Sequence, residues 1–394
     1  MFEIMDRDSQ EAVIKVIGVG GCGGNAVNHM VRNNVEGVEF ICANTDAQAL
    51  KKIEARTVLQ LGSAITKGLG AGTNPDIGRQ AAMEDRERIA EVLEGADMVF
   101  ITAGMGGGTG TGAAPIIAEV AKEMGILTVA VVTKPFAFEG KRTKVAVEGL
   151  EELSKHVDSL IIIPNEKLME VLGEDVPFLQ AFEAANDVLH NAVSGIAEII
   201  NCPGLVNVDF ADVRTVMSEM GMAMMGSAMA SGADRARIAA EQAVASPLLE
   251  DVNLANARGV LVNITASTSF KMKEYYDVMN TIKAFTAEDA TVIVGNVFDE
   301  SIGDGLRVTM VATGLNGVAG RRQQKPELRV MTQVRAGTTG QAVFVGGSSV
   351  SMGGAEDDTP AVFSSNGRRA TVEAMKQSGV EEYDIPAFLR KQAD

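Results

Sequence analysis

The sequence has no tryptophan and only three tyrosines, three cysteines and three histidines among its 394 residues. The cysteines form no CxxC pair and the histidines stand apart from them, which disfavours both a disulfide framework and a zinc site. The N-terminus carries no basic segment followed by an apolar stretch, and no apolar run is long enough to span a bilayer. These absences predict a reduced, cytoplasmic protein with no direct membrane insertion.

Positive charge is also scarce. The 35 basic side chains are outnumbered by 52 acidic ones, which gives a formal net charge of -17. Such a chain would repel a phosphate backbone rather than release counterions from it, so a nucleic acid is a disfavoured partner. The length, with 46% hydrophobic residues, is enough for one large or two modest domains.

The first half of the chain has the rhythm of a parallel sheet. Between Ala12 and about Pro164, six short apolar runs, most of them rich in β-branched residues, alternate with stretches of helical periodicity. The runs cover residues 12–19, 38–44, 58–62, 96–104, 127–135 and 159–165. This alternation favours βαβ units whose sheet is covered on both faces. Two of the expected crossover helices span residues 76–95 and 111–125, and each closes near a glycine.

The organisation changes after the longest helical pattern, at residues 178–202, which we interpret as a central helix joining two domains. The α/β domain before it covers residues 12–177, preceded by a flexible N-terminus at 1–11. A loop and a connecting helix are expected at 203–220. Residues 221–316 then alternate strands and helices in a smaller α+β domain.

The C-terminal part divides into a linker and a tail. Residues 317–380 are rich in Gly, Ser, Gln, Arg and Thr with little periodicity, which predicts a disordered linker. Residues 381–394 regain apolar side chains in an amphipathic pattern, which suits a partner-binding motif on a long tether. A frayed terminus is the alternative interpretation.

A glycine-rich loop follows the first expected strand. Its glycines at 18, 20 and 23 permit a tight turn and let backbone N–H groups approach an anion at a helix N-terminus. They also satisfy GxGxxG, so a dinucleotide site must be considered. That site requires an acid at the end of the second strand, whereas this strand ends at Asn44 with Asp46 nearby. A tight turn without a ligand is a third possibility.

A second glycine cluster, Gly104 to Gly112, follows the fourth strand and again precedes a helix. Loops at the carboxyl ends of parallel strands meet at one sheet edge, so both clusters can reach one polyphosphate, with Thr109 and Thr111 adding hydroxyls. A third loop, residues 68–75, could cover the terminal phosphate. No GxxxxGK[ST] motif occurs, which excludes a P-loop NTPase. The alternative, a merely flexible loop, poorly explains so many glycines and threonines between a strand and a helix.

Six motifs in order, GGCGGNAV, GLGAGTNP, GGGTGTG, PFAFEG, NVDFAD and DIPAFLRKQAD, resemble those of the FtsZ family, the bacterial cell-division branch of the tubulin family. The resemblance runs from about residue 12 to 315 and resumes at the tail. It implies a GTP-binding domain, a central helix and a C-terminal domain. It further implies GTP hydrolysis to GDP, with Mg²⁺ carried by the nucleotide, and head-to-tail polymerisation into protofilaments of the midcell division ring. We expect no metal site in the protein itself.

The resemblance also assigns residues around the nucleotide. Phe182 and Asn186 on the central helix would meet the base, although core packing and a polar helix face are the structural alternatives. Glu139 and Arg142 would contact the ribose and a nearby phosphate. The family usually has one more residue before this arginine, so Lys141 or Lys144 could fill the basic role. The phosphates would be held by Gly20, Gly21, Cys22, Gly23, Gly24, Asn25, Gly72, Gly107, Gly108, Thr109 and Gly110.

An acidic segment follows the central helix. Read alone, Asp209 suits a helix N-cap, and Asp212 would share its side of the helix start. The resemblance instead implies a catalytic loop that enters the pocket of the neighbouring subunit. There Asp209 and Asp212 would orient or polarise the attacking water, and Asn207 would help place it. Residues 382–394 would bind membrane-tethering and regulatory cell-division proteins.

Two other functions compete with an assembly GTPase. A nucleotide-binding scaffold that does not hydrolyse would have no use for Asp209 and Asp212. A Rossmann dehydrogenase would not explain the second glycine cluster and would need the missing acid after the second strand.

Overall fold

The computed structural model describes residues 12–172, 177–201, 208–219, 221–249, 254, 257–287 and 289–315. The expected flexible N-terminus at 1–11, the linker at 317–380 and the tail at 381–394 lie outside the described residues. Contacts divide the chain into one unit, Met1–Gln324, and a second, Lys325–Asp394, so the described residues all belong to the first. Within them, no helix is long and apolar enough to cross a membrane.

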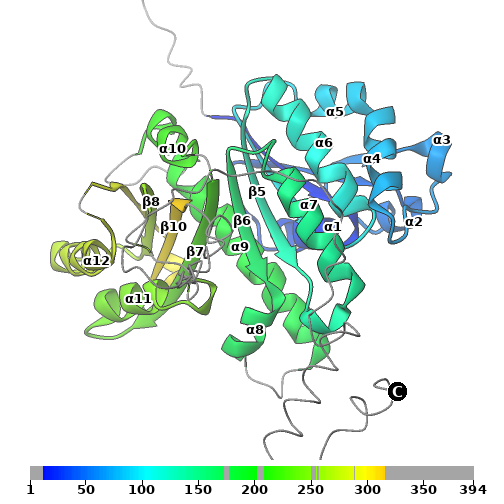
Figure 1. Ribbon diagram of the computed structural model, residues 1–394. Helices are drawn as coiled ribbons and strands as arrows, with labels where there is room; N and C mark the ends of the chain where they lie inside the picture. The colour runs from blue at the N-terminus through cyan, green and yellow to red at the C-terminus, as the bar shows by residue number, and fades with distance from the viewer. Residues whose placement is uncertain are drawn as a thin grey trace, which may run out of the picture. The chain divides into compact units, whose positions relative to one another are not determined.

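The six apolar runs of the first half form six parallel neighbouring strands, as predicted (Figure 1). Strand β1 is buried along its whole length, as expected for a sheet covered on both faces. The strand order is β3-β2-β1-β4-β5-β6. Their bounds are β1 Ile14–Val19, β2 Val38–Asn44, β3 Thr57–Gln60, β4 Met98–Gly104, β5 Leu127–Lys134 and β6 Ser159–Pro164.

The sheet continues into the second half of the chain. Strand β7 pairs in parallel with β6, and the order then runs β7-β10-β8-β9, with β10 antiparallel to both of its neighbours. A mostly parallel sheet of ten strands therefore links the two parts of the fold among the described residues. The later strands are β7 Gly221–Ser231, β8 Gly259–Ala266, β9 Thr291–Phe298 and β10 Gly305–Leu315.

Helices cover both faces of the N-terminal half of the sheet. One apolar cluster joins the sheet to α1 and α9, and a second joins the opposite face to α4, α5, α6 and α7. The first of these clusters also includes residues of α10, β8 and β10, so α9 packs against both halves of the fold. The described helices are α1 Gly20–Arg32, α2 Ala47–Leu50, α3 Ser63–Thr66, α4 Pro75–Glu84, α5 Arg86–Leu93, α6 Thr109–Glu123, α7 Lys141–Leu153, α8 Asn165–Leu172, α9 Phe178–Asn201, α10 Phe210–Met217, α11 Arg235–Val244 and α12 Met272–Phe285, with short 3₁₀ turns η1 Ala137–Glu139, η2 Pro247–Leu249 and η4 Glu300–Ile302.

The single helix predicted over residues 76–95 was wrong, because the structure breaks it at Asp85 into α4 and α5. The Asp85 side chain is buried and accepts hydrogen bonds from the Gly62 N–H at 2.7 Å and from Arg88 Nη1 at 2.9 Å. A buried carboxylate needs such partners. Its anchoring to the segment after β3 explains the break, which helical periodicity alone does not reveal.

Helix α9 carries the chain from one end of the sheet to the other. Phe182, near its start, lies beside the loops that follow β4 and β5. At its end, Asn201 Nδ2 donates a 2.6 Å hydrogen bond to the carbonyl of Gly37, just before β2. At 1.5 Å per residue these two positions are about 29 Å apart along the helix axis. The end of α9 therefore lies near the amino ends of the strands.

Helix α10 follows at that same end. Arg214 Nη2 donates a 2.9 Å hydrogen bond to the carbonyl of Gly125, which lies between α6 and β5. In Figure 1, α10 accordingly lies at the end of β5 and β6 that is away from their arrowheads. The acidic residues at the start of α10 are thus separated from the carboxyl ends of the strands.

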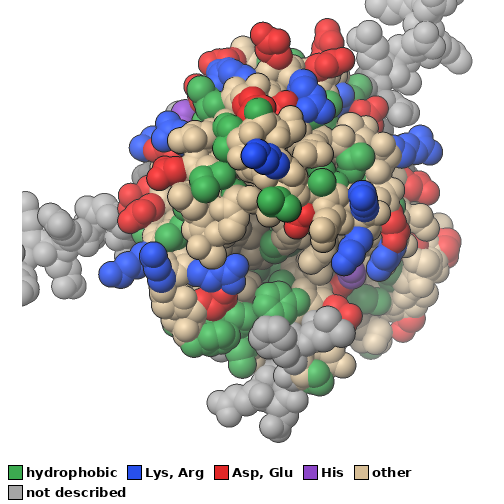
Figure 2. Space-filling model, turned by 90° about the vertical axis from the view of Figure 1, so that its right-hand side faces the viewer, with side chains coloured by type: hydrophobic (Ala, Val, Ile, Leu, Met, Phe, Trp, Pro, Cys, Tyr) green, Lys and Arg blue, Asp and Glu red, His purple; other side chains and the backbone are tan. Residues whose placement is uncertain are grey.

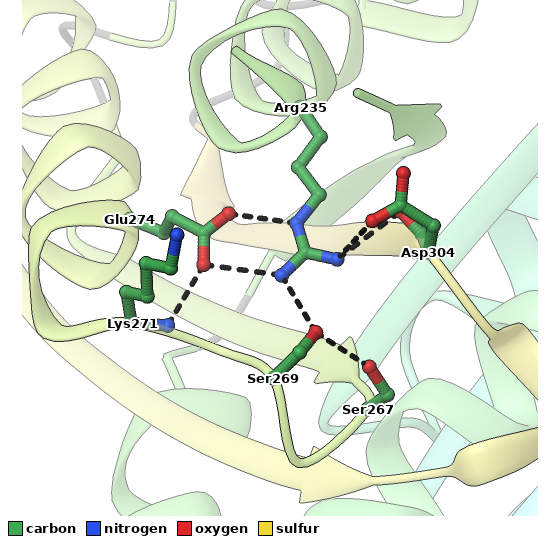
Figure 3. Close-up of polar contacts among 6 residues, drawn as sticks. All are labelled: Arg235, Ser267, Ser269, Lys271, Glu274 and Asp304. Carbon is green, nitrogen blue, oxygen red and sulfur yellow. Dashed lines mark hydrogen bonds and ion pairs between the residues drawn. The ribbon is translucent and has the colours of Figure 1, made fainter. Parts of the chain in front are cut away.

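A buried guanidinium organises the C-terminal part of the fold (Figure 3). The Arg235 side chain, 4% exposed, makes a two-point contact with Glu274 at 2.7 and 3.1 Å. It also donates to Ser269 Oγ and to the carbonyl of Asp304, and Glu274 accepts from the Lys271 N–H. These bonds join the starts of α11 and α12 to the loop after β8 and the turn before β10. Removing one partner of a buried ion pair typically costs about 3–5 kcal/mol.

Charged side chains of both signs are mixed on the face drawn in Figure 2. Acidic and basic groups alternate over this face rather than gathering into one field of a single sign.

Candidate nucleotide-binding site

Two helix N-termini meet at the carboxyl edge of the sheet. Helix α1 begins directly after β1 and α6 begins shortly after β4, and these two strands are paired neighbours. Neither first turn contains an acidic residue, and no described side chain caps either helix. The first backbone N–H groups of both helices are therefore free to bind an anion, which the helix dipoles also favour.

Close backbone contacts explain several glycines of the first loop. Gly20 has a φ of +74°, and a Cβ built there would lie 3.0 Å from the Gly110 nitrogen. The two glycine loops thus abut. A Cβ at Gly23 would lie 2.3 Å from the Thr102 carbonyl, so this glycine lets α1 pack on β4. Its role is close packing that brings the helix start into place.

The third loop packs on the second glycine cluster through backbone contacts. The Gly108 N–H donates a 2.9 Å hydrogen bond to the carbonyl of Gly72. A Cβ at Gly108 would lie 2.6 Å from that oxygen and 2.9 Å from the Ala71 carbonyl. The expectation that residues 68–75 lie at the same sheet edge as the glycine clusters is confirmed by these contacts.

A cavity of about 320 Å³ opens between these loops. A second cavity of about 280 Å³ adjoins it at Gly21, which lines both. Most of the predicted nucleotide-binding residues line one or the other. The first is lined by Gly21, Cys22, Gly72, Gly107, Gly108, Thr109, Gly110, Glu139, Arg142 and Phe182, and the second by Gly20, Gly21, Gly24 and Asn25.

Glu139 and Arg142 enter the cavity as an ion pair. Arg142 Nη1 lies 2.7 Å from Glu139 Oε2, and Glu139 Oε1 accepts from the Phe136 N–H at 3.1 Å. Of the three basic candidates, Arg142 is among the described lining residues, whereas the exposed Lys141 and Lys144 are not. The shortened loop therefore still brings an arginine to the cavity.

The central helix contributes Phe182 to the cavity. Its side chain is 39% exposed, and its ring meets that of Phe136 edge-to-face at 6.1 Å between centroids. Exposure of a large aromatic face beside a phosphate-binding edge suits stacking on a base. Asn186, one turn further along, is half-buried and is not among the described residues that line either cavity.

Asn165 is a lining residue that sequence reasoning missed. It is the first residue of α8, is 7% exposed, and its Oδ1 has no hydrogen-bond partner among the described residues. A buried amide oxygen without a partner is unfavourable unless a ligand or water satisfies it. The available signal was its position directly after the sixth apolar run, where the carboxyl end of a strand meets the site.

Cys22 places a neutral thiol beside the phosphate loops. Its sulfur lies 3.6 Å from Thr133 Oγ1, and both residues line the cavity. Burial raises the pKa of the Cys22 thiol above its ordinary value, and the contact with Thr133 opposes this only in part. The protonated form, which prevails at neutral pH, does not repel an anion as a thiolate would.

The two threonines of the second cluster have different roles. Thr111 is buried, and its hydroxyl accepts a 2.8 Å hydrogen bond from the Gly106 N–H within its own loop. Thr111 is not among the described residues that line the two cavities, so its expected contact with the ligand stays a prediction. Thr109 does line the cavity, and its Oγ1 lies 2.6 Å from Thr45 Oγ1.

The acidic segment is solvent-exposed and does not reach this cavity. Asp209 occupies the N-cap position of α10 by its backbone conformation, yet its side chain caps no N–H in the described part of the chain. Asp209 and Asp212 are both exposed, and neither is among the described residues that line the two cavities. Asn207 lies outside the described residues.

The site offers a phosphate cradle rather than a metal cluster. Among the described residues, no three His, Cys, Asp or Glu side chains are grouped so that they could hold a metal ion. Among the described lining residues, the acid of the first cavity, Glu139, is paired with Arg142. The acid of the second cavity, Asp46, accepts hydrogen bonds from the N–H groups of Gln48 and Ala49. Together, the parallel sheet, the two uncapped helix starts and the third loop define an α/β protein that binds a nucleoside polyphosphate.

Comparisons with known proteins identify the family to which this nucleotide-binding protein belongs. Residues 13–173 match the GTPase domain of the Tubulin/FtsZ family, and residues 221–316 match the C-terminal domain of the FtsZ family. The chain is 62% identical to the cell division protein FtsZ of Pseudomonas aeruginosa over 398 residues, which cover 100% of both chains. The protein therefore belongs to the FtsZ family of tubulin-like GTPases, as the six motifs indicated.

Solved structures agree with this assignment. An empty FtsZ dimer from M. jannaschii matches with a TM-score of 0.75 and 44% identity, covering 78% of this chain and 90% of that one. A GTPγS-bound protofilament of CetZ2 from Haloferax volcanii matches with a TM-score of 0.64 and 19% identity, covering 76% and 92%. The second likeness establishes a shared fold only.

Proposed function

We propose that this protein is a cytoplasmic, GTP-dependent cytoskeletal GTPase that polymerises head-to-tail into protofilaments of the division ring at midcell. The observation that carries the proposal is the separation, within one chain, of the nucleotide cavity from the acidic segment. The cavity lies at the carboxyl ends of the strands, and the acidic segment starts α10 near their amino ends. A relative described as an FtsZ dimer supports self-association of this fold.

The separation is large compared with the reach of a side chain. Strand β5 begins beside Gly125, which contacts α10, and it ends beside Pro135, which lines the cavity. Seven steps of about 3.3 Å give roughly 23 Å between the two ends of this strand. Asp209 and Asp212 are thus too far from the phosphates of their own chain. A second copy stacked head-to-tail would bring its acidic segment to the open side of the cavity.

Each group would then have a distinct task. The loops of one copy hold the phosphates through backbone N–H groups, while Asp209 and Asp212 of the next copy orient and polarise the attacking water, which Asn207 helps to place. Mg²⁺ enters with the nucleotide and neutralises part of the phosphate charge. Since Asp209 caps no N–H in the described structure, its carboxylate is available for this role.

The C-terminal tail would connect the polymer to its partners. Residues 382–394, which lie outside the described residues, contain the apolar side chains Ile385, Phe388 and Leu389 beside Arg390 and Lys391. Such a motif can fill a groove with its apolar groups and place its charges at the rim. We propose membrane-tethering and regulatory cell-division proteins as its partners.

The test combines light scattering with phosphate release over a range of protein concentrations. With GTP, scattering should appear above a threshold concentration, and turnover per subunit should rise as interfaces form. Asp212→Ala should bind GTP normally and hydrolyse it poorly, whereas Asp234→Ala, an exposed acid on α11's N-terminal side, should behave as the parent. Turnover per subunit that is independent of concentration far below the threshold would contradict a shared site.

A further inference from the structure

A fully buried hydroxyl lies directly behind the phosphate cradle. Thr45 follows β2 and has 0% of its surface exposed, and its Oγ1 lies 2.6 Å from Thr109 Oγ1. Thr109 is the first residue of α6 and lines the nucleotide cavity. Thr45, which is not among the described residues that line the cavities, is thus hydrogen-bonded to Thr109, which lines one of them.

The direction of this hydrogen bond follows from burial. In a pair of hydroxyls one donates and the other accepts. If Thr109 donated, the Thr45 O–H would need another acceptor, and the described residues offer its Oγ1 none besides Thr109. An unmade donor in a fully buried place is costly, so Thr45 donates. The Thr109 oxygen is then occupied as an acceptor, and its own O–H is left to donate into the cavity.

The backbone of Thr45 is held by α3 and by the third loop. Its carbonyl accepts hydrogen bonds from the Gly70 N–H at 3.2 Å and from Thr66 Oγ1 at 3.3 Å. The same loop contacts the second glycine cluster, where the Gly72 carbonyl accepts from the Gly108 N–H. Thr45 is therefore fixed relative to Thr109 by contacts at both its side chain and its backbone.

We propose that Thr45 is a positioning residue that holds Thr109 as a hydrogen-bond donor to a phosphate oxygen of the bound nucleotide. The proposal rests on the assignment of this cavity to the phosphates. Thr45 itself never touches the nucleotide. Its hydroxyl fixes the orientation of the Thr109 hydroxyl before the nucleotide binds. The Thr109 hydroxyl therefore loses no further rotational freedom on binding.

The experiment uses the full chain and four variants. Thr45→Val keeps the shape and removes the hydroxyl, Thr45→Ser keeps the hydroxyl and removes the methyl, Thr109→Val removes the donor, and the double variant combines both valines. GTP affinity is measured at equilibrium, with thermal unfolding in parallel. Thr45→Val should weaken GTP binding about three- to tenfold, and Thr45→Ser should bind within about twofold of the parent. The double variant should bind no more weakly than Thr109→Val alone.

A purely structural role for Thr45 predicts a different pattern. The effects of Thr45→Val and Thr109→Val would then add, and Thr45→Ser, which leaves a gap in the packing, would lose affinity as well. Either result overturns the proposal. If Thr45→Val does not fold, Thr45→Cys replaces it, since its thiol is a weak donor of similar size and should also weaken binding.

The variant Gly107→Val separates this proposal from the assignment of the cavity. If Gly107→Val abolishes GTP binding while Thr45→Val binds GTP as the parent does, the Thr45 role alone is refuted. If Gly107→Val binds GTP as the parent does, the cavity assignment fails and the Thr45 role fails with it.

Discussion

Gly107→Val should abolish nucleotide binding without unfolding the protein. A Cβ built at Gly107 meets no described atom within 4 Å, and its φ lies outside the left-handed region that favours glycine. Gly21 is the other described glycine that meets both conditions, and both residues line the cavity. The side chains added at these positions would therefore occupy the space of the ligand and not that of the protein.

The size of the effect can be worked out from the lost hydrogen bonds. Displacing a phosphate from two backbone N–H groups removes two charge-assisted bonds of about 1.5–3 kcal/mol each. A loss of about 3 kcal/mol or more corresponds to at least about a hundredfold weaker binding. The melting temperature without nucleotide should stay within about 2 °C of the parent, because the added Cβ meets no described atom within 4 Å.

Gly108→Val is the matched contrast. Its Cβ would lie 2.6 Å from the Gly72 carbonyl and 2.9 Å from the Ala71 carbonyl, so the third loop would have to shift. Overpacking of this kind costs about 1–3 kcal/mol, and the melting temperature should fall by several degrees. Calorimetric titration with GTP and thermal unfolding of both variants provide the assay. Parental GTP affinity in folded Gly107→Val would refute the assignment of the cavity.

Three further outcomes are expected. Phe182→Ala should weaken GTP binding at least fivefold, because stacking of a base on an aromatic ring is worth about 1–3 kcal/mol. In the parent, ATP should compete for the site less well than an equal concentration of GTP, and equal competition would count against base recognition. Deleting residues 382–394 should leave GTP hydrolysis and polymerisation nearly intact, as measured by phosphate release and light scattering, whereas loss of polymerisation would make the tail structural. Burial, together with the nearby charges of His29 and Arg307, lowers the pKa of His190. The contribution of His190 to stability is therefore present above the ordinary histidine pKa of about 6.5 and is lost as the pH falls. The parent should therefore lose more stability than His190→Gln in thermal melts between about pH 7.5 and about pH 5.5, and parallel losses would contradict this.

Much of the fold could be predicted because hydrophobic periodicity is a local signal. The six buried runs of the first half form parallel strands, and the pattern over residues 178–202 corresponds to α9. The break at Asp85 could not be predicted in this way. It depends on a hydrogen bond to Gly62, a residue distant in sequence, and tertiary contacts of this kind override helical pattern.

The candidate site could be predicted where backbone geometry decides it. Glycines at strand ends indicated the phosphate cradle, and a helix does follow each of the two clusters, although α6 begins at Thr109 and not at residue 111 as expected. Side-chain directions were harder to predict. Thr111 faces its own loop, and Asn165 faces the cavity, because the direction of a side chain is set by packing that the linear spacing does not contain.

A mixing experiment tests the shared active site most directly. Gly107→Val provides an intact acidic segment without a nucleotide, and Asp212→Ala provides a loaded cavity without the carboxylate. Alone, Gly107→Val should hydrolyse no GTP, and Asp212→Ala should hydrolyse it poorly. In an equal mixture that assembles at random head-to-tail, about a quarter of the interfaces pair a loaded cavity with an intact Asp212, so phosphate release should recover to a corresponding fraction of the parental rate. A mixture that co-sediments yet releases no more phosphate than its separate components would contradict catalysis across the interface.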